Sequence, residues 1–250
     1  MVTIINRLLS HLPQKLPSKK SHLIFWFLVL LFIEQLWEDL YMSTKQMVNH
    51  SQLWSLTVIW LLAIFIPFFY DYLKSITNPW YSEHQKITKK QWLHIPLLII
   101  LGNIAIGLIN KFTMYVLLNN KHVQTSINQQ DLSSFTHGST NIIFFVFLTI
   151  GLAPVIEEFV FHKLIITSPN KKQRIKQAII SFVLFAVLHV LTSFFMPYNQ
   201  DYWIKLGMYF LDYSVISLIL VYEYYMYHNY RYNVFLHSSW NLITVLIMLI

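Results

Sequence analysis

The sequence has 250 residues, of which 56% are hydrophobic, 17% aromatic and only 12% charged. Soluble domains carry about 25% charged residues, so the composition excludes an ordinary soluble protein and predicts one that crosses a membrane several times. There is no cysteine, which excludes disulfides, thiol nucleophiles and thiolate metal sites. The net charge of +7 is interpreted as a sign of membrane orientation, not of nucleic-acid binding.

In chain order, residues 1–21 form a basic segment that we expect to lie on the membrane surface. The runs that follow are close to the ~20 apolar residues that a transmembrane helix needs. We see no internal repeat, so residues 22–250 are predicted to form one all-α transmembrane domain, a polytopic helical bundle. The seven predicted spans lie near residues 22–42, 52–73, 92–118, 141–162, 177–196, 203–223 and 232–250.

The distribution of basic residues predicts the orientation of these spans. With the N-terminus inside, 14 of the 18 Lys and Arg residues fall in cytoplasmic segments and 4 fall outside. Cytoplasmic loops of membrane proteins carry an excess of Lys and Arg. We therefore predict an N-in arrangement of seven helices in an integral, multi-pass protein, most simply of a bacterial cell membrane.

Polar side chains inside three of the later apolar runs are the main clue to function. Ionised carboxylates at membrane depth are costly, so they are rarely present without a partner or a chemical role. The polar residues that stand out in these runs are Glu157, Glu158, His189, His237 and Asn241.

These residue types suit the activation of water. A carboxylate that is removed from water beside a second carboxylate tends to hold a proton, and it can pass a proton from water to a leaving amine. Histidine can share that proton, and an asparagine amide can donate to an oxyanion. Adjacent helical residues point about 100° apart, so we expect one of Glu157 and Glu158 to contact the water and the other to orient a partner helix.

At these positions the sequence resembles the CAAX-protease and bacteriocin-processing family of intramembrane proteases, also called CPBP or Abi proteins. That family shows Glu-Glu-x-x-x-Arg on one helix, Phe-x-x-x-His on the next and His-x-x-x-Asn/Asp near the end. The resemblance covers about residues 141–245. The corresponding segments here are Glu157 to His162, Phe185 to His189, and His237 to Asn241, with His162 in place of the arginine.

The resemblance implies roles for individual residues. Glu157 would activate water together with His189, Glu158 would make structural contacts, and His237 with Asn241 would stabilise the oxyanion. Phe161, His162 and Phe185 are assigned, on weaker grounds, to substrate binding. Lys163 is expected to point away from the glutamates. No histidine pair has the His-x-x-x-His spacing of a helical zinc site, so we favour a mechanism without a cofactor over one that uses Zn²⁺.

The implied function is an intramembrane endopeptidase that cleaves peptide bonds near the cytoplasmic face. Its partners would be the lipid bilayer and a peptide or protein substrate, such as a bacteriocin or a prenylated peptide, in bacteriocin self-immunity or peptide maturation. One alternative is a non-catalytic immunity or sensor protein that binds a peptide or its receptor. A second, less favoured alternative is a small transporter or channel that uses the carboxylates as a proton relay. A simpler interpretation of Glu157 and Glu158 is that they anchor a helix end by pairing with His162 or Lys163.

Overall fold

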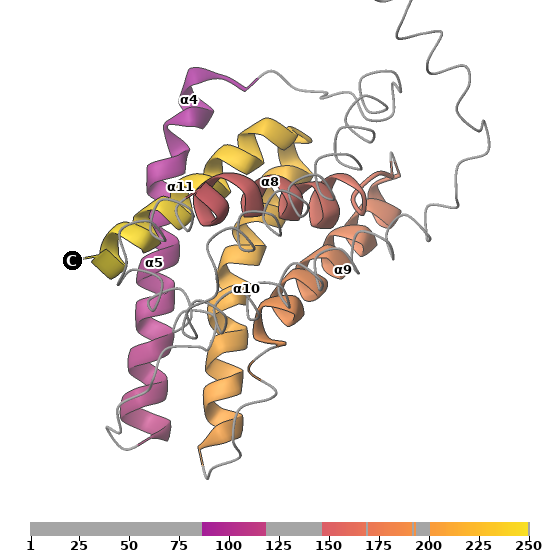
Figure 1. Ribbon diagram of the computed structural model, residues 1–250. Coiled ribbons are helices and arrows are strands. Elements are labelled where there is room, and N and C mark those ends of the chain that lie inside the picture. Colours follow the sequence, from indigo (N-terminus) through magenta and orange to yellow (C-terminus); the bar gives the residue numbers. More distant parts are fainter. Residues whose placement is uncertain (1–86, 119–146, 169, 192, 194–200, 250) are drawn as a thin grey trace, which may run out of the picture.

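The computed structural model describes residues 87–118, 147–168, 170–191, 193 and 201–249, and all its regular elements in these ranges are helical (Figure 1). The basic segment 1–21 and the predicted spans 22–42 and 52–73 lie outside the described residues. The predicted all-α class is confirmed for the part of the chain that is described.

The described chain forms three consecutive groups of helices. The short helix α4 (Lys89–Trp92) precedes α5 (His94–Phe112), which continues into the π-helix η2 (Thr113–Leu117). The second group is one segment of three pieces, η4 (Phe147–Leu152), α8 (Ala153–Glu157) and η5 (Glu158–Lys163), of which η4 and η5 are π-helical. The third group comprises α9 (Lys171–Val190), α10 (Tyr202–Tyr227) and α11 (Tyr230–Leu249).

Three helices are long and apolar enough to cross a membrane, namely Lys89–Leu117, Lys171–Val190 and Tyr202–Tyr227. They overlap the predicted spans 92–118, 177–196 and 203–223. The described parts of the predicted spans 141–162 and 232–250 are helical, but they are not among these three. The total of seven spans and the N-in orientation remain predictions.

The helix ends follow from local sequence signals. The Asn170 side chain accepts a hydrogen bond from the Gln173 backbone at 3.2 Å and caps α9. Helix α10 ends at Tyr227 and is followed by His228, whose φ of 48° is left-handed, and α11 begins at Tyr230. An Arg174 guanidinium nitrogen lies 2.8 Å from Nε2 of His228. This contact joins the start of α9 to the turn between α10 and α11.

Three backbone carbonyls of the segment 147–163 are bonded by side chains from neighbouring helices. Asn241 Nδ2 donates to the Thr149 carbonyl at 2.8 Å. The Tyr230 hydroxyl donates to the Val155 carbonyl at 2.6 Å, and Ser181 donates to the Phe161 carbonyl, also at 2.6 Å. A helix that departs from α geometry within a membrane needs its freed backbone groups satisfied by neighbours. These contacts therefore stabilise the irregular segment.

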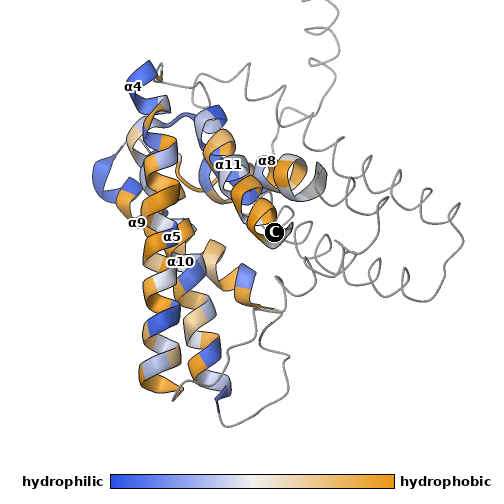
Figure 2. Cartoon of the chain, turned by 90° about the vertical axis from the view of Figure 1, so that its left-hand side faces the viewer, coloured by the Kyte–Doolittle hydropathy of each residue, from blue (hydrophilic) through white to orange (hydrophobic). Residues whose placement is uncertain are grey.

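Helix α10 lies between α9 and α5, and it contacts both of them. In Figure 1, α11 and α8 run across the upper part of this group, and in Figure 2 both lie to the right of the upper half of α5. Apolar residues predominate along α5 (Figure 2). The main core gathers buried side chains from η5, α9, α10 and α11, including Phe161, Phe185, Leu220 and Leu236. The carboxylates and histidines lie in this core.

Helix α5 approaches α11 at a glycine. A Cβ atom added to Gly102 would collide with the Trp240 ring and would lie 2.9 Å from Cδ1 of Ile219. The Trp240 side chain, which is buried, thus occupies the space that the missing Cβ leaves. Since Trp240 lies between His237 and Asn241 in the sequence, this packing helps to fix the face that α11 presents to the second group of helices.

Candidate active site

The two glutamates lie where the helix changes its hydrogen-bonding pattern. Glu157 ends α8 and Glu158 begins η5. In η5 the backbone N–H of Leu164 donates to the Phe159 carbonyl, five residues earlier, at 3.0 Å. A π-turn contains more residues than an α-turn, so successive side chains are separated by a smaller angle, and π-bulges are frequent at functional sites. Both glutamates can consequently face α11.

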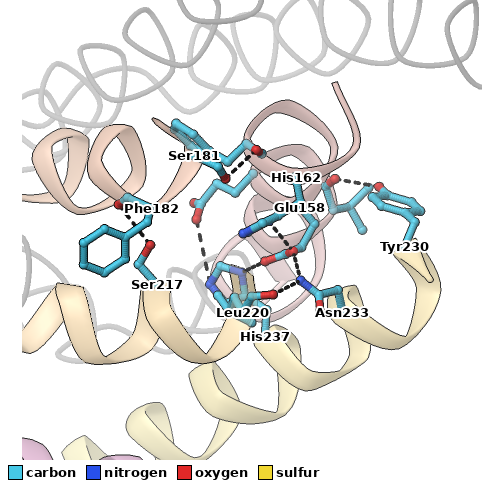
Figure 3. Close-up of polar contacts among 12 residues, drawn as sticks. Glu158, His162, Ser181, Phe182, Ser217, Leu220, Tyr230, Asn233 and His237 are labelled. Atoms are coloured by element: carbon cyan, nitrogen blue, oxygen red, sulfur yellow. Dashed lines mark hydrogen bonds and ion pairs between the residues drawn. The ribbon is translucent and has the colours of Figure 1, made fainter. Parts of the chain in front are cut away.

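Glu158 is fully buried and is surrounded by hydrogen-bonding groups (Figure 3). Its Oε1 atom lies 2.9 Å from Nδ1 of His237. Its Oε2 atom lies 2.7 Å from Nδ1 of His162, one turn further along the same helix, and accepts a hydrogen bond of 2.5 Å from Nδ2 of Asn233. A buried carboxylate needs such partners to remain ionised. Glu158 therefore organises residues from two helices around itself.

Glu157 is more accessible, with its side chain 15% exposed, and it faces two histidines. Its Oε2 atom lies 3.4 Å from Nε2 of His189 and 3.8 Å from Nε2 of His237. No hydrogen bond to this oxygen is found within the described residues, although the atom is buried. The site thus brings together residues from α8, α9 and α11, which are far apart in the sequence.

The contacts made by Nδ1 of His189 and His237 determine whether the Nε2 atoms, which face Glu157, carry a hydrogen or a lone pair. His189 Nδ1 lies 2.9 Å from the Phe185 carbonyl, and His237 Nδ1 lies 2.9 Å from the Glu158 carboxylate. A carbonyl or an ionised carboxylate only accepts hydrogen bonds, so both Nδ1 atoms must carry the proton. In the neutral rings each Nε2 then presents a lone pair towards Glu157. With both rings neutral, Glu157 Oε2 and the two Nε2 atoms are thus three hydrogen-bond acceptors that face one another.

Aromatic rings hold His189 in this orientation. Its ring stacks on Phe185 with centroids 4.2 Å apart and approaches Tyr213 at 4.9 Å. Phe161 packs edge-on against Phe185 at 5.4 Å. Phe161, His162 and Phe185 are all buried in the described part of the chain. Their assignment to substrate binding stays a prediction, and the contacts seen here are with other site residues.

Two further sequence-based expectations concern Asn241 and Lys163. The Asn241 amide nitrogen donates a hydrogen bond to the Thr149 carbonyl at 2.8 Å. The Lys163 amine lies over the Tyr230 ring, 5.0 Å from its centroid, whereas His162 contacts Glu158. Lys163 therefore points away from the glutamates, as expected, and His162 occupies the position next to Glu158.

Asn233 is a site residue to which the sequence analysis assigned no role of its own. It is fully buried on α11, and besides Glu158 it donates to the Leu220 carbonyl of α10 at 3.0 Å. A signal was present in the sequence, because Asn233, His237 and Asn241 are spaced four residues apart and share one helical face.

The atoms that could act as metal ligands at Glu157 are the Nε2 atoms of His189 and His237 and the Oε2 atom of Glu157 itself. In the ranges that the structure describes, no group of three or more His, Asp or Glu side chains is arranged to hold a metal ion. The three convergent atoms are acceptors, which also suits a water molecule that donates its hydrogens.

Taken together, a buried carboxylate–histidine site beside apolar helices of membrane-spanning length is typical of a hydrolytic membrane enzyme. Residues 139–243 match the family described as type II CAAX prenyl endopeptidase, Rce1-like. This match includes every residue of the candidate site and confirms the family resemblance over that segment. Because the family consists of proteases, the match supports a peptidase in an integral membrane protein. Neither the curated proteins nor the solved structures gave a match.

Proposed function

We propose that the chain is an intramembrane endopeptidase that hydrolyses a peptide bond with water activated by Glu157. The observation that carries this proposal is the convergence of Glu157 Oε2 with the Nε2 atoms of His189 and His237, at 3.4 and 3.8 Å. When both rings are neutral, a group that binds among these three atoms must present hydrogens to them. A water molecule satisfies this requirement and is polarised towards hydroxide.

The chemistry balances with these residues alone. Glu157, assisted by His189, takes one proton from the water, and the water oxygen forms a bond to the carbonyl carbon of the peptide. The tetrahedral intermediate then collapses as the C–N bond breaks. The proton held by Glu157 and His189 passes to the leaving nitrogen. The products are a carboxylic acid and an amine, which exchange a proton to give a carboxylate and an ammonium ion, and no oxidant or reductant is consumed.

His237 and Asn241 act on the oxyanion in this proposal. For this role His237 takes up a proton from solvent at Nε2, and Glu158, 2.9 Å from Nδ1, stabilises the imidazolium that forms. Its Nε2–H then donates to the developing oxyanion, together with the amide hydrogen of Asn241 that does not bond to Thr149. Glu158 thus contributes by holding His237 and not by contacting the substrate.

We propose a membrane-associated peptide or protein as the substrate. The CAAX prenyl endopeptidase description of the matching family makes a prenylated C-terminal peptide the first candidate. A bacteriocin peptide, cleaved in self-immunity or maturation, is the second candidate. In either case the protein would act near the cytoplasmic face of a bacterial cell membrane.

The direct test uses purified protein in proteoliposomes with a farnesylated, internally quenched peptide that ends in a CAAX sequence, and with its unprenylated counterpart. Cleavage by the wild type, located by mass spectrometry and lost in Glu157→Gln, is the expected result. Asn103→Ala is a matched control, because within the described residues the hydrogen bond found for this amide goes to the Ile99 carbonyl of its own helix α5. Equal cleavage by wild type and Glu157→Gln contradicts the mechanism.

A second test separates catalysis from binding. Cells that express wild type, Glu157→Ala or His189→Ala at matched membrane levels are challenged with a panel of bacteriocins. A protease loses protection in both variants, while the bacteriocin is recovered uncleaved. A protein that acts by binding its peptide or receptor still protects the cells in both variants.

A further inference from the structure

We propose that Asn233 and His162 are positioning residues that clamp one oxygen of Glu158 from two helices, and that this clamp sets the orientation of His237. This inference rests on the proposed function, because its purpose is to keep Nε2 of His237 directed at Glu157 and the substrate. Neither residue touches the water in this scheme; both act through Glu158.

The geometry of the clamp is asymmetric. The Oε2 atom of Glu158 makes an ion-pair contact of 2.7 Å with His162 Nδ1 and accepts a hydrogen bond of 2.5 Å from Asn233 Nδ2 (Figure 3). Its Oε1 atom lies 2.9 Å from His237 Nδ1. All four side chains are buried. Two contacts on one oxygen fix the plane of the carboxylate, and that plane determines where Oε1 meets His237.

The Asn233 amide has a single usable orientation. One of its hydrogens bonds to Glu158 and the other bonds to the Leu220 carbonyl at 3.0 Å. A flipped amide would place its oxygen against both a carboxylate and a carbonyl, where acceptors face acceptors. The contact to Leu220 also fastens the first turn of α11 to α10. Asn233 therefore links the position of Glu158 to the packing of two helices.

His162 and Asn233 together contact Glu158 in the way that a single guanidinium group could. A guanidinium offers several N–H groups in a planar fork and can hold a carboxylate alone. A histidine facing the carboxylate with Nδ1 offers one N–H. At position 162 the chain has histidine, so the second donor must come from another residue, and Asn233 supplies it from α11. The clamp thus explains how a histidine suffices at this position.

The test compares substitutions that keep or remove each donor. His162→Asn keeps a donor near the Nδ1 position, whereas His162→Ala removes it. Asn233→Leu removes both amide hydrogens at similar volume, and Asn233→Asp also adds a like charge. Asn103→Ala serves as the control. Each variant is assayed in proteoliposomes with the quenched farnesylated peptide, and kcat and KM are measured separately.

We expect Asn233→Leu and His162→Ala each to lower kcat by roughly 10- to 100-fold with KM nearly unchanged, since small misplacements of a catalytic group have effects of this size. His162→Asn should recover most of the loss. The double variant, His162→Ala with Asn233→Leu, should lose less than the product of the two single losses, because the residues act as one unit. Losses that multiply, or an effect on KM alone, would overturn the clamp.

A readout without substrate separates this proposal from the proposed function. Asn233→Leu should lower the melting temperature in detergent clearly in the wild type but much less in a Glu158→Gln background, since the shared carboxylate is then absent. Equal shifts in both backgrounds refute the clamp. If the coupling is found but wild type cleaves neither peptide, the clamp stands and the peptidase proposal fails for these substrates.

Discussion

Nδ1 of His237 lies 2.9 Å from Oε1 of Glu158, and this contact turns the opposite nitrogen of the ring towards Glu157. Two adjacent glutamates thus approach one imidazole from its two sides. The arrangement is possible because the chain changes from α-helix to π-helix between them. In the proposed mechanism the less exposed carboxylate orients the ring and the more exposed one meets the water.

Glu157→Gln should abolish hydrolysis while leaving the fold intact. The substitution keeps the size of the side chain but removes the base, and general acid–base groups contribute about 10²- to 10⁴-fold to the rate. Oε2 of Glu157 accepts no hydrogen bond within the described residues, so little stability is lost. The check is a fall in kcat with an unchanged melting temperature. A large drop in melting temperature would instead make Glu157 a structural residue.

Glu158→Ala should destabilise the protein as well as inactivate it. The change leaves His162, Asn233 and His237 buried without their shared acceptor. Breaking a buried charged pair costs about 3–5 kcal/mol. We expect the free energy of unfolding of Glu158→Ala in detergent micelles to be lower than that of the wild type by about this amount. Glu157→Gln, at the neighbouring position, is the control. Similar stabilities of the two variants would contradict the distinct roles assigned to the glutamates.

Phe185→Leu should slow catalysis by loosening His189. The aromatic ring stacks on the imidazole with centroids 4.2 Å apart, and its loss allows the histidine to turn away from Glu157. We expect roughly a tenfold lower kcat, a modest part of the effect that misplacement of a catalytic group can have. Phe182→Leu is the matched control on the same helix, since Phe182 is only partly buried and packs at the edge of the core. Equal effects of both substitutions would point to general packing.

Gly102→Ala should destabilise the contact between α5 and α11. The added methyl group meets the Trp240 ring and Cδ1 of Ile219, and overpacking of this kind costs about 1–3 kcal/mol. Gly107→Ala, on the same helix, meets nothing within 4 Å and should be neutral or stabilising by up to about 1 kcal/mol. The melting temperatures of the two variants provide the comparison. A lower melting temperature for Gly107→Ala than for Gly102→Ala would contradict the packing of Gly102 against Trp240.

Removal of divalent metal ions should leave hydrolysis unchanged if water is activated by Glu157 and His189 alone. The measurement is the cleavage rate of protein treated with 1,10-phenanthroline and then dialysed, with its zinc content determined by mass spectrometry. Addition of Zn²⁺ should not increase the rate. Loss of activity that Zn²⁺ restores would make the two histidines and Glu157 metal ligands.

The sequence was sufficient for the helical class and for most of the site. Long apolar runs predict helices whatever their packing, and the structure has membrane-length helices at Lys89–Leu117, Lys171–Val190 and Tyr202–Tyr227. Costly polar residues in apolar runs identified Glu157, Glu158, His189 and His237, because such residues are rarely retained without a role. The same argument overlooked Asn233, since an uncharged amide at a helix start has many ordinary explanations.

The tertiary structure decided how these residues act. The change to π-helix at Glu158 depends on neighbours such as Ser181, whose hydroxyl bonds to the Phe161 carbonyl, and a residue pattern along one helix does not report such partners. The ring nitrogen that each histidine directs at Glu157 is set by groups that only folding brings near, such as Glu158 for His237. Sequence periodicity predicts which face of a helix is buried, whereas directional hydrogen bonds between distant helices depend on their packing in three dimensions.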